Sequence, residues 1–356
     1  MAAEFPGERL KRLATAPSDR AFFAGSVALF ALVILALLGV SALFMDPLCA
    51  TGDTGRFFAM ADLIAHGGTP YLDYQDPKPP LIFLTLVPPA VLGQPFLGGL
   101  LLVGAANLAS AVLVMQIARA YYGRPAGLLA GLLFLGNMAW AQGFFVITEP
   151  FVVLFLLLAT YFAAVSPRRR YFLAGLAAGV AVGYKQYALI AVPLLLLFQY
   201  WRGDLRRAGA LLAGVALPLA AVFGALGLAY GYGGLAGALY WTFGVAGPYV
   251  ERVDVDNALY AGATATELAL IVALAAFVAA SLAAGLARAG GFRRLEPGEK
   301  LFLLFAAGFA LTLLVRPYLH YWALAAPFLA ILWAGWLYAG DRRKARDGNL
   351  YPGPGT

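Results

Sequence analysis

Residues 53–81 read DTGRFFAMADLIAHGGTPYLDYQDPKPPL and follow the first long apolar run of the chain, residues 21–44. The stretch holds four aspartates, one arginine, one histidine and one lysine, whereas the apolar runs around it have almost no ionisable side chains. Acidic and basic groups gathered in one loop beside membrane segments indicate binding or chemistry at that loop.

Composition sets the class of the protein. Of the 356 residues, 62% are hydrophobic and 12% charged, and the mean hydropathy is +0.80. Soluble domains have about 25% charged residues, and several apolar runs here approach the roughly 20 residues that cross a bilayer as a helix. We therefore predict an all-α, polytopic membrane protein of the cell membrane. Residues 21–44 are too long for the core of a signal peptide and should remain as an anchor.

Basic residues decide the predicted orientation. Of the 25 Lys and Arg residues, 20 fall into segments that can all lie in the cytoplasm, together with both termini. The positive-inside rule favours this arrangement, and the net charge of +7 then reflects contact with anionic lipid rather than with nucleic acid. The predicted spans are residues 21–44, 99–119, 125–143, 149–165, 171–186, 187–201, 208–229, 262–287, 300–316 and 319–339.

Between the first two predicted spans, an outer loop at residues 45–98 carries the charged stretch. Residues 53–66 have helical spacing and predict an amphipathic helix lying flat on the membrane. Residues 80–93 are apolar but short, and Pro88-Pro89 interrupts helical hydrogen bonding, so we interpret them as an interfacial or re-entrant helix. If they cross, the protein has 11 spans rather than 10. Residues 1–20 and the basic, disordered tail at 341–356 flank a single transmembrane domain, 21–340.

Isolated charges from separate segments converge on the predicted outer face: the loop from Asp53 to Lys78, then Glu149, Lys185, and Arg316 with His320. Each alone could be an interfacial anchor. Asp53 could also be a helix N-cap, a position that Asp favours. The single cysteine excludes an internal disulfide, and two histidines argue against a histidine-rich metal centre.

Four segments resemble the GT-C glycosyltransferases, with likeness to the lipid A aminoarabinose transferases and the protein O-mannosyltransferases. They read PYLDYQDPKPPLIF, FFVITEPFVVLFLLLATYF, GVAVGYKQYALIAVPLLLLF and RPYLHYWALAAPFLAIL, in that order. The chain departs from the pattern at Thr54, where many relatives have a second carboxylate. It also has no arginine in GQPFLGGLLLVGAAN, where protein mannosyltransferases usually carry one.

The resemblance implies an inverting transfer of a sugar from a polyprenyl-phosphate donor to an acceptor hydroxyl of a lipid, glycan or protein, at the outer membrane face. Such a reaction needs a base for the hydroxyl and cations for the departing phosphate. The implied roles are Asp53 as base, Glu149 as second carboxylate, Lys78, Lys185 and Arg316 at the phosphate, and Tyr71, Asp73, His320 and Tyr321 at the sugar or acceptor. The outer acids could hold Mg²⁺ or Mn²⁺, or act alone.

Two other classes of function remain open from the sequence: a transporter or flippase of lipid-linked glycans, and a structural or assembly subunit. A transporter should have related halves and ionisable groups near the bilayer centre. Here the halves look unrelated and the isolated charges cluster at the outer edge, so the sequence favours an enzyme.

Overall fold

The computed structural model describes residues 17–44, 52–166, 169–245, 265–315 and 318–346, and every regular element of these residues is a helix. The predicted all-α class is confirmed. The α-helices are α2 (Pro17–Phe44), α3 (Gly52–Ala65), α4 (Leu81–Val91), α5 (Pro95–Tyr122), α6 (Arg124–Trp140), α7 (Glu149–Thr160), α8 (Tyr171–Tyr184), α9 (Ala191–Trp201), α10 (Ala208–Leu239), α13 (Ala265–Ala289), α14 (Pro297–Ala310), α15 (Thr312–Val315) and α16 (Trp322–Arg346). Short π-helices η1 (Tyr161–Val165) and η4 (Tyr240–Gly244) and 3₁₀-helices η2 (Gln186–Ile190), η3 (Leu205–Arg207), η5 (Phe292–Arg294) and η6 (Leu319–Tyr321) extend or join them.

Each predicted span overlaps one of these helices or a helix and its adjoining turn; α10 continues ten residues beyond the predicted span 208–229, and residues 262–264 and 316 lie outside the described residues. Five helical segments of the described residues are long and apolar enough to cross a membrane: Ser18–Leu43, Pro95–Tyr122, Leu205–Gly244, Val272–Ala289 and Leu319–Tyr338. Four shorter apolar helical segments accompany them. The protein is thus a polytopic helical membrane protein.

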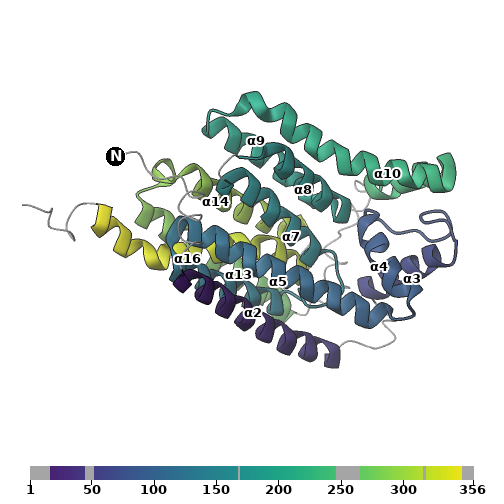
Figure 1. Ribbon diagram of the computed structural model, residues 1–356, viewed down its shortest axis with the longest axis horizontal. Coiled ribbons are helices and arrows are strands. Elements are labelled where there is room, and N and C mark those ends of the chain that lie inside the picture. Colours follow the sequence, from purple (N-terminus) through teal and green to yellow (C-terminus); the bar gives the residue numbers. More distant parts are fainter. Residues whose placement is uncertain (1–16, 45–51, 167–168, 246–264, 316–317, 347–356) are drawn as a thin grey trace, which may run out of the picture.

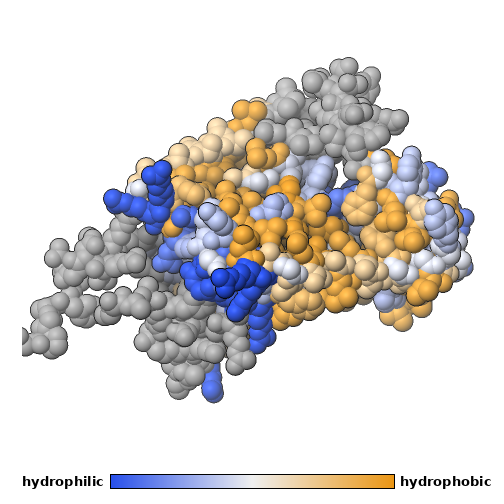
Figure 2. Space-filling model, turned by 90° about the horizontal axis from the view of Figure 1, so that it is seen from above, coloured by the Kyte–Doolittle hydropathy of each residue, from blue (hydrophilic) through white to orange (hydrophobic). Residues whose placement is uncertain are grey.

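The helices form a bundle around α16 (Figure 1), which packs against α5, α6, α7 and α14. The α16 side chains are mostly buried, whereas α2 and α13 lie at the periphery with few of their described side chains buried. On α2 the exposed residues are apolar, for example Leu32 and Leu35. Figure 2, seen from the side of α9 and α10, shows a broad apolar surface between more polar ends. Such a surface faces lipid, because lipid tails accept apolar side chains at no cost.

Glycines set the distance between α8 and α10. A Cβ atom added at Gly175 would lie 2.0 Å from the carbonyl oxygen of Leu211, and one at Gly179 would lie 2.4 Å from that of Val215. Helices in membranes approach this closely where small residues face each other. The packing fixes α8 along its length and therefore fixes the position of Lys185, the residue that follows it.

The helix α3 has the predicted amphipathic pattern, with Phe57, Met60 and Ala61 fully buried. The prediction that this face rests on the membrane is wrong in part, because the face packs against α4, where the Phe57 and Phe83 rings meet edge-on at 5.8 Å. The α4 helix has 11 residues, so it is about 16 Å long, too short to cross a hydrocarbon core of about 30 Å.

Figure 1 places α3 and α4 at one end of the bundle, here called the α3–α4 end, and the C-terminal end of α16 at the opposite end. Arg119, in the last turn of α5, forms a buried ion pair with Asp19 of α2 at 2.9 Å. Arg169 pairs with Asp204, next to η3. These basic segments belong to the predicted cytoplasmic side, so the charge distribution along the sequence corresponds to two ends of one bundle.

Candidate active site

Asp53 and Lys78 form an ion pair at the α3–α4 end, with Lys78 Nζ 3.2 Å from Asp53 Oδ2. Asp53 lies in the first turn of α3. The helix begins at Gly52, so Asp53 is its second residue and not its N-cap. The Lys78 side chain is 10% exposed and that of Asp53 30%. The pair is therefore partly open to solvent on the carboxylate side.

The backbone around Lys78 is held by side chains. Asp76 is buried, and its Oδ1 accepts a hydrogen bond from the Lys78 N–H at 2.9 Å. The Tyr71 hydroxyl donates to the Lys78 carbonyl oxygen at 2.8 Å. Prolines on both sides of Lys78 limit its backbone further. These contacts fix the backbone at Lys78, and the fixed backbone sets the direction in which the side chain leaves the loop.

Glu149 and Lys185 form a second ion pair, and both side chains are almost fully buried, 1% and 3% exposed. Glu149 opens α7, and Lys185 lies in extended conformation between α8 and η2. Thr148 Oγ1 donates to Glu149 Oε2 at 3.0 Å, and His320 Nε2 lies 3.8 Å from Glu149 Oε1. The Tyr321 ring covers the lysine, with its centroid 3.8 Å from Nζ, a cation–π distance.

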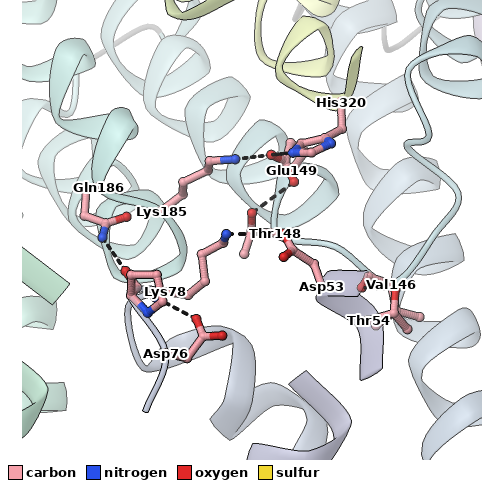
Figure 3. A network of polar contacts seen from close by, with 11 residues as sticks. Asp53, Thr54, Asp76, Lys78, Val146, Thr148, Glu149, Lys185, Gln186 and His320 are labelled. Carbon is pink, nitrogen blue, oxygen red and sulfur yellow. Dashed lines mark hydrogen bonds and ion pairs between the residues drawn. The ribbon is translucent and has the colours of Figure 1, made fainter. Parts of the chain in front are cut away.

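The two ion pairs lie side by side (Figure 3), and this brings together segments that lie far apart in the sequence. Partial burial raises the pKa of Asp53, but the positive charges of Lys78, His320 and Lys185 outweigh it, so the pKa of Asp53 is lowered. The carboxylate is therefore ionised at neutral pH. Burial raises the pKa of Asp76, although the neighbouring Lys78 lowers it. Of Asp53 and Asp76, Asp53 is the one whose ionised form the neighbouring charges favour.

Buried ion pairs are poor sources of stability, because removing two charges from water costs about as much as their attraction returns. A buried pair, Glu149–Lys185, beside a partly buried one, Asp53–Lys78, at one end of an apolar bundle is more readily explained as a binding or catalytic site. Neutral side chains connect the site to its surroundings. Gln186 Nε2 donates to the carbonyl oxygens of Pro77 and Thr242, and Thr54 Oγ1 donates to that of Val146 at 3.0 Å.

Five of the predicted site residues meet in this cluster: Asp53, Lys78, Glu149, Lys185 and His320. Tyr321 also contributes, as the ring against Lys185. Sequence reasoning did not assign roles to Asp76, Thr148 and Gln186. The one signal available for each was its place within two residues of a predicted site residue.

The remaining predicted site residues have other positions. Tyr71 is buried, with its hydroxyl on the Lys78 backbone, so in this structure it holds the loop. Asp73 is exposed and accepts a hydrogen bond from the Thr69 N–H at 2.7 Å, which stabilises a turn. Sugar binding by these two residues stays a prediction. Arg316 lies outside the described residues. Among those residues, no three His, Cys, Asp or Glu side chains are grouped so that they could hold a metal ion.

No protein-family model matches the chain, and no curated protein matches it. Among solved structures it is similar to ArnT from Cupriavidus metallidurans bound to undecaprenyl phosphate. The sequence identity is 17%, the match covers 91% of this chain and 79% of that chain, and the TM-score is 0.42. At this level of similarity the match gives no information on the substrate or reaction of the present protein.

Proposed function

We propose that the protein is an integral-membrane, inverting glycosyltransferase of the GT-C type, which transfers a sugar from a polyprenyl-phosphate donor to an acceptor hydroxyl at the outer membrane face. The observation that carries the proposal is the convergence of Lys78 and Lys185 on Asp53 and Glu149, at the end of an apolar bundle. A lipid-linked donor needs both an apolar surface and positively charged side chains. Its tail partitions into lipid and its phosphate needs charged, hydrogen-bonding partners.

The ammonium groups of Lys78 and Lys185 are the groups that would receive the donor phosphate. In the resting site each is neutralised by one carboxylate. An arriving phosphate competes for the same N–H donors, so binding exchanges lysine–carboxylate contacts for lysine–phosphate contacts. Positive charge placed at the departing phosphate oxygen stabilises the transition state, because negative charge grows there as the bond breaks.

Asp53 is the proposed general base. Its carboxylate takes the proton of the acceptor hydroxyl while the hydroxyl oxygen forms a bond to the anomeric carbon of the sugar. The bond from that carbon to the phosphate oxygen breaks, and its electron pair leaves with the phosphate. Lys78 holds the pKa of Asp53 low in the resting site. When the phosphate engages Lys78, that effect weakens and Asp53 becomes a stronger base.

Glu149 is buried against Lys185 and His320, so it is better placed to orient these two groups than to accept a proton from a bulky acceptor. His320 is the member of this group with the larger exposure, 18%, and is the candidate to contact the sugar. In this proposal the acceptor approaches over Asp53, the more exposed carboxylate of the two.

The test uses the purified protein in lipid nanodiscs with radiolabelled polyprenyl-phosphate sugars, one sugar at a time, and a membrane extract as acceptor source. We expect release of polyprenyl phosphate together with labelled acceptor for one donor, and no release with Lys78→Met. His66→Gln is the matched control, because His66 lies in the same loop but is 75% exposed and contacts Asp62. Donor movement across a sealed bilayer without bond cleavage would instead identify a flippase and would refute the proposal.

A further inference from the structure

The Gln186 side chain connects three segments of the site. Its amide nitrogen donates to the Pro77 carbonyl oxygen at 2.6 Å and to the Thr242 carbonyl oxygen at 2.7 Å. A side-chain amide has two N–H donors, so both are in use. The bonds join the loop at residues 69–80, here called the Lys78 loop, to the junction after α8 and to η4.

The Lys78 loop needs such a partner because of its composition. Residues 77–80 read PKPP, so three of the four have no backbone N–H. The one N–H that remains, on Lys78, is bonded to Asp76. Residues 77–80 therefore have no N–H group left to donate to neighbouring backbone. The carbonyl oxygens of Pro77 and Lys78 receive side-chain donors instead: Gln186 at Pro77 and Tyr71 at Lys78.

The junction after α8 positions two consecutive residues with different tasks. Lys185 has φ −157° and ψ 127°, an extended conformation, in which neighbouring side chains point to opposite sides. Lys185 reaches Glu149, whereas Gln186 reaches the Lys78 loop (Figure 3). One short segment thereby fixes one lysine directly and the other through its loop.

We propose that Gln186 is a positioning residue, which holds the Lys78 loop and η4 against the α8 junction so that the ammonium groups of Lys78 and Lys185 can engage one phosphate. The inference rests on the proposed function for the identity of that phosphate. It assigns to a neutral side chain the task of setting the spacing of the two cations. Gln186 itself contacts neither the phosphate nor the sugar.

The test compares Gln186→Met, which keeps the length of the side chain but has no N–H donor, with Gln199→Met. Gln199 is buried and donates to a backbone carbonyl oxygen, that of Arg207, in η3. Hydrogen exchange is followed by mass spectrometry for residues 69–80 and 240–245, and binding is measured with geranylgeranyl phosphate as probe. We expect faster exchange in both segments and about 10- to 30-fold weaker binding for Gln186→Met alone, since two hydrogen bonds to carbonyl groups are lost.

A third variant, Gln186→Glu, adds a signature that loosened packing would not produce. An ionised carboxylate only accepts hydrogen bonds, whereas a protonated one donates a single bond. The affinity of this variant for the probe is compared with that of the wild type at the same pH. We expect the loss of affinity to be larger at pH 8 than at pH 5. Unchanged exchange and affinity in Gln186→Met, or equal changes in Gln199→Met, would overturn the inference. Failure of the wild type to bind the probe would count against the proposed function, and the exchange data would still decide on the positioning role.

Discussion

The Glu149–Lys185 pair gives the sharpest test of the site, because both members are almost completely buried. Removing one partner of such a pair leaves an uncompensated charge in a medium that solvates it poorly, which costs about 3–5 kcal/mol. We expect Glu149→Gln and Lys185→Met each to lower the free energy of unfolding by about that amount. In Glu149→Gln, neither the ring of Tyr321 nor the nearby His320 supplies the full negative charge that Lys185 has lost.

The double variant separates stability from function. Replacing both charges with neutral side chains of similar volume is often neutral or stabilising, so Glu149→Gln/Lys185→Met should recover most of the stability lost in either single variant. A coupling energy of at least about 2 kcal/mol is within the range for directly contacting residues. Activity should not recover, because the double variant has neither the cation for the phosphate nor the carboxylate that orients it.

The assay is a double-mutant cycle by reversible unfolding in mixed detergent micelles, with donor turnover measured on the same samples. Arg169→Met is the matched control for a lysine or arginine ion pair away from the site, since Arg169 pairs with Asp204 while 26% exposed. For this partly exposed pair we expect a smaller loss than for the buried one, nearer the roughly 0–1 kcal/mol typical of ion pairs that solvent reaches. If the double variant is as unstable as the single ones, the two charges do not interact as inferred. If it is fully active, the pair is structural.

Three further predictions concern other parts of the chain. Asp53→Asn should reduce transfer by at least about 100-fold with folding intact, following the usual contribution of a general base. The pKa of Asp53 is lowered on folding. The stability that its charge contributes should therefore be present above its unfolded pKa of 3.8 and lost as the pH falls through the lower folded value. A cysteine at Thr69, after Cys49 is replaced, should react with an impermeant thiol reagent in intact cells, and labelling only after lysis would reverse the orientation. Asp19→Asn should cost about 3–5 kcal/mol by leaving Arg119 unpaired in the protein interior, while turnover per folded molecule stays at the wild-type level.

The helical segments could be predicted from the sequence because bilayer thickness fixes their length and because charge interrupts them. Each predicted span has its helix, and the short α4 helix also falls where an apolar but non-crossing segment was expected. Packing partners were less predictable. An amphipathic helix has the same pattern whether its apolar face meets lipid or protein, which is why α3 was expected on the membrane but packs on α4.

The charged members of the site could be predicted because ionisable groups are rare in this chain and each of them interrupts or ends an apolar run. Their pairing could not, since Asp53 with Lys78 and Glu149 with Lys185 depends on which helices are neighbours. Tyr71 illustrates a second limit. It has a positive φ of 67°, which is unusual for a residue with a side chain, and its side chain is buried under the rest of the Lys78 loop. No periodicity indicates this conformation, and the contact of Tyr71 with the backbone of Lys78 could not be predicted from the sequence.

The charges of the site fit the charge changes of the proposed reaction. The two ion pairs consist of two ammonium groups and two carboxylates, whose charges sum to zero. A polyprenyl-phosphate sugar is a phosphodiester with one negative charge, and the departing polyprenyl phosphate is a monoester that can carry two. The extra negative charge appears on the phosphate as Asp53 takes the acceptor proton and loses its own. The total charge in the site therefore stays constant, and Lys78 is released from Asp53 when the phosphate needs it most.

This balance predicts that binding of polyprenyl phosphate is coupled to proton uptake at Asp53. Once the phosphate engages Lys78, Asp53 loses the largest of the positive charges that lower its pKa, so this pKa should rise and the carboxylate should take up protons more readily at acidic pH. The number of protons taken up follows from calorimetric binding enthalpies in buffers with different ionisation enthalpies. The phosphate titrates as well, so the informative quantity is the difference between the wild type and Asp53→Asn, in which only the phosphate can exchange a proton. We expect greater uptake in the wild type at pH 5 and a smaller difference at pH 8. Equal uptake in both proteins would mean that the phosphate binds without displacing Lys78 from Asp53, and the exchange of partners proposed for the two lysines would be wrong.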